Sequence, residues 1–92
     1  MNINRAREII SGAGYKTQKG IGSEFEFFVT DGKVAITCLV LEPGNFYAVS
    51  SHEDIDGAEC KDENGILEAV KKAFDYEYEF LANGGKPLRS AW

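Results

Sequence analysis

The stretch EFEFFVTDGKVAITCLVL, residues 24–41, constrains the fold of this chain more than any other. Apolar and polar residues alternate on both sides of Asp31-Gly32, the residue pair that a tight hairpin turn favours. A two-residue turn pairs Thr30 with Lys33 and brings both apolar rows to the same side. The alternation and the turn therefore predict the same antiparallel hairpin. The residues expected on its inner face are Phe25, Phe27, Val29, Val34, Ile36, Cys38 and Val40.

A third strand is expected at FYAVS, residues 46–50, after the turn EPGN. If Pro43-Gly44 is the whole loop, Tyr47 and Val49 join the inner face. The opposite face is then not fully polar, and either the first helix and the C-terminal tail cover it or it is an interaction surface. The residues expected there are Phe28, Ala35, Leu39, Leu41, Phe46 and Ala48.

Two segments have the spacing of amphipathic helices. Residues 3–13 form a short helix that Asn2 or Asn4 can cap, and residues 65–82 form a long helix that Asp62 or Asn64 can cap. The glycine-rich stretch between the first helix and the hairpin is a loop or an irregular edge strand. The apolar stripe expected on the long helix is Leu67, Val70, Phe74, Tyr78 and Leu81, widened by Ile66, Ala69 and Ala73.

The chain has 92 residues, which is enough for one hydrophobic core and too short for two. We therefore expect one compact domain over residues 1–92, of the α+β class. Its order is α-β-β-β-α, with a three-stranded antiparallel sheet packed against the long C-terminal helix and a short N-terminal helix.

We expect neither a membrane span nor a secretory signal from this sequence. No apolar run reaches the roughly 18 to 20 residues that cross a bilayer, and MNINRAREII lacks the apolar centre of a signal peptide. We expect a cytoplasmic protein that does not bind membranes. In that compartment Cys38 and Cys60 are expected to be free thiols.

Acidic residues are concentrated in one part of the chain. Residues 53–79 hold ten acids and three lysines, a net charge of −7, whereas the other residues have a net charge of +2. Such a patch repels nucleic-acid phosphates and attracts basic protein surfaces. We therefore expect no direct nucleic-acid binding. The alternative is that these acids only keep a small domain soluble.

The densest acidic stretch, SSHEDIDGAECKDENG, does not have the spacing of a metal site. In a calcium loop that begins at Asp54, glycine would be needed at the sixth position and glutamate at the twelfth, but Gly57 is fourth and Gly65 is twelfth. A zinc site needs three or four closely spaced Cys or His ligands, and His52 is the one histidine of the chain. We expect no metal and no other cofactor.

Cys60 is the candidate nucleophile, and its surroundings do not activate it. It lies between Glu59 and Lys61 in a carboxylate-rich stretch, which favours the neutral thiol over the reactive thiolate. The paired carboxylates of the chain lie on an expected loop or an exposed helix face rather than in a cleft. We expect no catalytic residues and no enzymatic activity.

The order α-β-β-β-α is also that of double-stranded RNA-binding domains. These domains contact phosphates through basic residues at the start of the last helix. Here that region reads DENGILEAVKK, with acids first and lysines only at positions 71 and 72. Because the charge is opposite to what this mechanism needs, RNA binding is not expected.

The last helix carries alternating acids and aromatics in FDYEYEF. With Phe74 and Tyr78 turned to the core, Asp75, Tyr76 and Glu79 would be exposed together. Tyrosine beside carboxylates suits the recognition of a basic surface, and the alternative is that all the aromatic side chains pack. The full set of predicted partner-binding residues is Glu53, Asp54, Asp56, Glu59, Asp62, Glu63, Asp75, Tyr76 and Glu79.

A compact acidic chain of this length, without catalytic or cofactor motifs, resembles the small inhibitors that phages and mobile elements encode, of which anti-CRISPR proteins are the best-known group. The acids at positions 53, 54, 56, 59, 62, 63, 75, 77 and 79 carry this resemblance. It implies a protein that occupies a basic nucleic-acid-binding surface of a Cas complex. The group shares no sequence motif, so no residue roles carry over.

The sequence therefore predicts a non-enzymatic inhibitor that binds a basic protein surface, such as that of a Cas protein or complex. Inhibition would arise from steric and electrostatic competition with nucleic acid. The alternative is a generic interaction or homodimerisation module that uses the apolar outer face of the sheet, around Phe28, Leu39 and Phe46.

Overall fold

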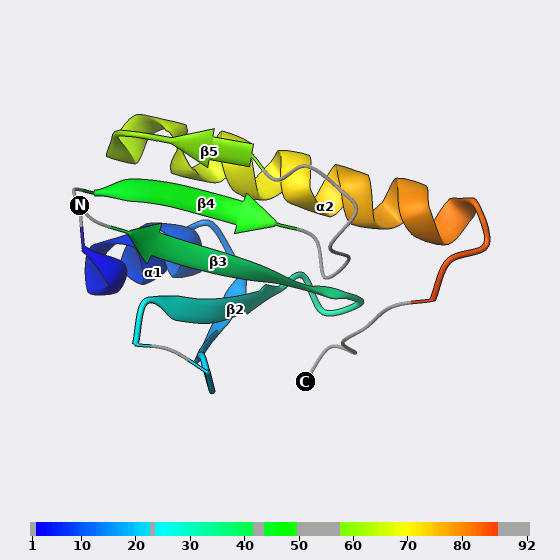
Figure 1. The fold of residues 1–92 in the computed structure, drawn as a ribbon, viewed down its shortest axis with the longest axis horizontal. Helices are drawn as coiled ribbons and strands as arrows, with labels where there is room; N and C mark the ends of the chain where they lie inside the picture. Colours follow the sequence, from blue (N-terminus) through cyan, green and yellow to red (C-terminus); the bar gives the residue numbers. More distant parts are fainter. Residues whose placement is uncertain (1, 23, 42–43, 50–57, 87–92) are drawn as a thin grey trace.

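The computed structural model describes residues 2–22, 24–41, 44–49 and 58–86, which form a five-stranded antiparallel sheet with two α-helices on one face (Figure 1). The strands lie in the order β1-β2-β3-β4-β5, the same as their order along the chain. The predicted α+β class is confirmed. The elements are α1 (Ile3–Gly12), β1 (Lys16–Lys19), β2 (Glu26–Thr30), β3 (Ala35–Leu41), β4 (Asn45–Val49), β5 (Ala58–Cys60), a 3₁₀ turn η1 (Glu63–Gly65) and α2 (Ile66–Ala82).

The predicted number of three strands is wrong, because a short strand is added at each edge of the sheet. β1 lies in the glycine-rich region, where an edge strand was one of two alternatives, and β5 lies in the acidic stretch that was expected to be a loop. Both strands are short: β1 has no apolar residue, and the three residues of β5 are too few for their alternation to indicate a strand. Main-chain pairing with β2 and β4 forms them instead. With five strands, the order no longer matches that of double-stranded RNA-binding domains.

The β2–β3 hairpin forms, but its turn is longer than the predicted two residues. Thr30 pairs with Ala35 rather than with Lys33. The carboxylate of Asp31 accepts hydrogen bonds from the N–H groups of Lys33 at 2.9 Å and Val34 at 3.1 Å, and Thr30 Oγ1 donates to the carbonyl of Val34 at 2.6 Å. Because the register shifts by two residues, the side chains of β2 and β3 keep their predicted faces. Phe25, which was expected on the inner face, precedes β2 and is 44% exposed.

The predicted register of the third strand is wrong, and this error exchanges its two faces. Leu41 pairs with Asn45, so the connection is one residue longer than the two-residue loop that the sequence indicated. A shift of one residue turns every side chain to the other side. Phe46 and Ala48 are therefore fully buried, whereas Tyr47 is half-buried on the opposite face.

Both helices pack on the inner face of the sheet, and their apolar residues complete the core. Asn2 caps α1, since its side-chain oxygen accepts the N–H of Arg5 at 2.8 Å. Because Ala6 and Ile10 of α1 are fully buried in the same cluster as α2, the alternative in which the first helix covers the outer face is wrong. The core cluster comprises Ala6, Ile10, Phe27, Val29, Val34, Ile36, Cys38, Val40, Phe46, Ala48, Ile66, Ala69, Val70, Ala73 and Phe74.

The buried stripe of α2 is rotated from the predicted one. Leu67 and Tyr78, which were expected in the core, are 39% and 38% exposed, and the carboxylate-bearing Glu77 is fully buried. The hydroxyl of Tyr78 donates a hydrogen bond to the carboxylate of Asp31. This contact ties the later part of α2 to the β2–β3 turn. The buried residues of α2 are Ile66, Ala69, Val70, Ala73, Phe74 and Glu77.

The outer face of the sheet exposes fewer apolar side chains to solvent than predicted. Phe46 and Ala48 lie on the inner face, and Phe28 and Ala35 are buried, at 3% and 0% exposed. Of the predicted residues, Leu39 remains half-buried and Leu41 is 39% exposed. Neither α1 nor α2 packs on this face. The half-buried residues of β4 on it are Asn45, Tyr47 and Val49.

Candidate functional site

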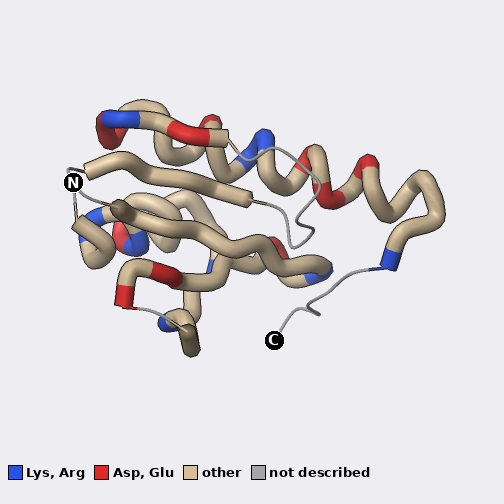
Figure 2. Tube along the Cα trace, viewed as in Figure 1, with Lys and Arg blue, Asp and Glu red and all other residues tan. Residues whose placement is uncertain are grey.

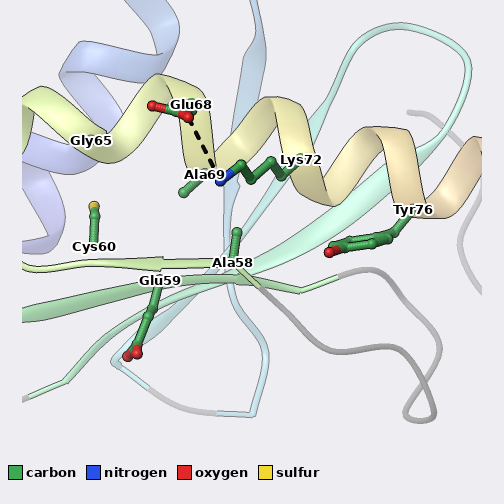
Figure 3. Close-up of a pocket in the computed structure, with 8 residues that line it drawn as sticks. All are labelled: Ala58, Glu59, Cys60, Gly65, Glu68, Ala69, Lys72 and Tyr76. Carbon is green, nitrogen blue, oxygen red and sulfur yellow. Dashed lines mark ion pairs between the residues drawn. The ribbon is translucent and has the colours of Figure 1, made fainter.

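An open groove of about 290 Å³ lies between β5 and α2 (Figure 3). β5 is an edge strand, and α2 runs beside it over the inner face of the sheet. The whole of β5, Ala58–Cys60, lines the groove on one side. The lining residues on the other side are Gly65, Glu68, Ala69, Lys72 and Tyr76.

Small side chains form the inner part of the groove. Figure 3 shows Ala58 and Cys60 pointing toward α2, where they face the helix beside Ala69. One end is closed by the contact between Gly65 and Cys60, because a Cβ atom added to Gly65 would lie 2.7 Å from the Cβ of Cys60. The space between strand and helix therefore depends on the absence of larger side chains there.

Charged and aromatic side chains form the rim of the groove. Glu68 and Lys72 face each other one helical turn apart, with 3.6 Å between the carboxylate oxygen and Nζ (Figure 3). Glu59 points away from α2, on the face of the sheet where it pairs with Tyr47. Tyr76 is 38% exposed and lies at the far end from Cys60. The rim thus offers the carboxylate of Glu68, one ammonium group and an aromatic ring to a partner, and the carboxylate of Glu59 lies on the opposite face of β5.

The thiol in the groove is neutral at physiological pH. Partial burial raises the pKa of Cys60, and the negative charge of Asp62 raises it further. Complete burial also raises the pKa of Cys38, which lies in the core. Neither thiol is therefore activated as a nucleophile.

Within the described part of the chain, no group of three or more His, Cys, Asp or Glu side chains is arranged to hold a metal ion. His52 lies outside the described residues. The stretch in which the calcium and zinc spacings were tested is therefore described only from Ala58 onward.

The predicted partner-binding residues of the acidic stretch fall into three groups. Glu53, Asp54 and Asp56 lie outside the described residues. Glu59 lines the groove. The remaining two make local contacts. Asp62 caps η1 by accepting the N–H of Asn64 at 2.9 Å. Glu63 accepts a hydrogen bond from Nε of Arg5 at 3.1 Å, which raises the pKa of that guanidinium.

The three predicted residues of α2 are all exposed, and one of them lines the groove. Tyr76 lines the groove, whereas Asp75 and Glu79 are not among its lining residues. Sequence reasoning missed the groove residues Glu68 and Lys72. It also missed the burial of Glu77, although Glu77 lies three residues after Phe74 and therefore on the core side of the helix.

The charges of the described residues are divided between two regions (Figure 2). Residues 58–82, which form β5, η1 and α2, hold seven acids and three lysines, a net charge of −4. The remaining described residues hold four acids and six bases, a net charge of +2. The groove therefore lies within the acidic side of the domain.

The chain has no significant match among protein-family models, curated proteins or solved structures. In the described residues, neither helix has the length and apolar character required to cross a membrane.

Proposed function

We propose that this domain is a non-enzymatic inhibitor that binds the basic, nucleic-acid-binding surface of another protein. The acidic surface formed by β5 and α2 occupies that surface and excludes the nucleic acid. A Cas protein or complex is the first class of partner to test. The observation that carries the proposal is the separation of charge, with a net charge of −4 on residues 58–82 against +2 on the other described residues.

The exposed carboxylates of this surface act mainly on the rate of association. An isolated ion pair in solvent contributes only about 0–1 kcal/mol. A concentrated field of one sign, by contrast, raises the rate at which an oppositely charged surface is encountered, by about tenfold or more at low salt. Asp75 and Glu79 are exposed one helical turn apart on α2 and contribute directly to this field. Binding is therefore fast and weakens as salt rises.

The proposal is tested by measuring association rates with guide-loaded Cas effector complexes by biolayer interferometry at low and high ionic strength. The double variant Asp75→Lys/Glu79→Lys should bind the responding complex about tenfold more slowly at low salt. The control Glu8→Lys/Glu24→Lys changes the net charge equally, at exposed positions outside the acidic surface. Equal losses in the two double variants would contradict a localised surface.

The second candidate function is homodimerisation through the outer face of the sheet. It is favoured by the cross-strand pair of Leu39 and Tyr47, which are both half-buried on the face that neither helix covers. Light scattering coupled to size-exclusion chromatography tests this function. A dimer that Leu39→Glu dissociates would support it, whereas a monomer at high concentration would contradict it. Phe28 is unsuitable for this test because its side chain is buried.

A further inference from the structure

We propose that the partner is held as an extended basic segment that adds a strand to the edge of β5 that no other described strand pairs with, and that it lies in the groove beside α2. This proposal deepens the proposed function, and it rests on that function for the basic character of the partner. It assigns the occupant of the groove as a peptide segment rather than a folded surface. Addition of a strand to an exposed sheet edge is a general mode of peptide recognition.

The two edges of the described sheet differ in their capacity to accept another strand. β1, at one edge, carries Lys16 and Lys19, and charged residues on an edge strand oppose pairing with another chain. Lys19 pairs with Phe27, whose side chain is in the core, so the charged side chain of Lys19 lies on the inner face of the sheet at that edge. β5, at the other edge, has no lysine and presents two small side chains around Glu59. Strand addition is therefore favoured at β5.

The geometry of β5 assigns a different environment to each side of the added strand. Alternate side chains of a strand point to opposite faces. One set would lie on the outer face beside Glu59, where a lysine or arginine of the partner meets a carboxylate. The other set would enter the groove between Ala58 and Ala69, with the ring of Tyr76 at one end. A cation over that ring would gain a cation–π interaction.

Lys72 is the groove residue that opposes a basic occupant. Its ammonium group is 3.6 Å from Glu68, and both side chains are largely exposed. Replacement by glutamine removes a repulsive charge and releases the carboxylate of Glu68 for the partner. Lys72→Gln should therefore bind a basic peptide about two- to fivefold more tightly than the wild type.

The experiment uses the full chain and an acetylated, amidated octapeptide of alternating threonine and lysine as the probe. The readout is the rate at which iodoacetamide alkylates Cys60, measured by peptide mass spectrometry, with the fully buried Cys38 as an internal reference. Peptide at about ten times its Kd should slow alkylation of Cys60 about tenfold, because only the free protein reacts. A version N-methylated at every peptide bond has the same charge and cannot donate main-chain hydrogen bonds to β5, so that only half of the strand hydrogen bonds can form. It should protect less.

Two variants test whether the groove, rather than diffuse charge, holds the peptide. Glu59→Gln and Asp75→Asn each remove one exposed negative charge, but only Glu59 belongs to β5, where its carboxylate would lie beside the outward side chains of the added strand. Glu59→Gln should weaken peptide binding about two- to fivefold, and Asp75→Asn should change it much less. Equal effects of the two variants would overturn the proposal. So would equal protection by the N-methylated peptide, or no protection up to about 5 mM of the unmodified peptide.

The failure of this proposal is distinguishable from failure of the proposed function. The peptide experiments could fail while Asp75→Lys/Glu79→Lys still slows association with the partner complex. In that case the groove is not the binding site, but the acidic surface still binds the partner. If that double variant behaves like Glu8→Lys/Glu24→Lys, the proposed function itself is wrong, whatever the peptide does.

Discussion

Replacement of Phe46 by alanine tests the register of β4 and with it the face on which the core is built. Phe46 is fully buried, pairs with Val40, and has its ring centroid 6.4 Å from that of Phe27. Truncation of a buried phenylalanine lowers the free energy of unfolding by about 3–5 kcal/mol, since it removes apolar contacts and leaves a cavity. A chain of this length has a total unfolding free energy of about 5–14 kcal/mol. Phe46→Ala should therefore lose a large part of the stability and lower Tm by about 12 °C or more.

The matched control is the neighbouring aromatic residue, Tyr47. It is half-buried on the outer face, so Tyr47→Ala should destabilise by only about 1 kcal/mol. Urea denaturation followed by circular dichroism gives both values, with an unchanged m-value as the check that the same two-state unfolding is compared. If Tyr47→Ala is the more destabilising of the two, the two-residue turn indicated by the sequence is correct and the observed register is wrong.

Three further predictions follow from single contacts. Burial and its hydrogen bond to the carboxylate of the β2–β3 turn raise the pKa of Tyr78 to about 12, above its ordinary value of about 10. This contact therefore stabilises the folded state below pH 10, and the stabilisation is lost as the pH rises toward 12. In urea unfolding, the free energy of unfolding of Tyr78→Phe should fall by about 1 kcal/mol less than that of the wild type over this pH range. Parallel pH profiles of the two proteins would contradict the contact. Gly65→Ala places Cβ 2.7 Å from the Cβ of Cys60 and should lower the unfolding free energy by about 1–3 kcal/mol, whereas Gly12→Ala meets no atom within 4 Å and should be neutral or stabilising. In the native protein at pH 8, a thiol reagent followed by absorbance should modify Cys60 and leave the buried Cys38 unmodified until urea is added; equal rates would contradict the core position of Cys38.

The part of the fold that the sequence predicts best is the part with strong periodic patterns. The alternation of residues 24–41 determines the faces of β2 and β3 even though the turn is longer than predicted, because a two-residue shift preserves side-chain direction. β4 has no such tolerance. One additional residue in its connection exchanges Phe46 and Tyr47 between core and surface, and nothing in its own alternation distinguishes the two registers.

The candidate site was predicted in part. The sequence shows the concentration of acids and the exposure of Asp75, Tyr76 and Glu79, which the structure places on the surface of α2. It does not show the groove, because the groove requires β5. That strand has three residues, too few for their alternation to predict it, so its formation depends on main-chain pairing with β4 rather than on local preference.

Competition with nucleic acid for a single basic surface is the most direct test of the proposed function. Fluorescence anisotropy would follow a labelled target DNA bound by a guide-loaded Cas effector complex while the protein is titrated in. The proposed function predicts that the protein displaces the DNA, that displacement weakens as salt rises, and that Asp75→Lys/Glu79→Lys loses it while Glu8→Lys/Glu24→Lys retains it. Displacement that is unaffected by salt and by reversal of Asp75 and Glu79, or binding that leaves the DNA in place, would contradict it.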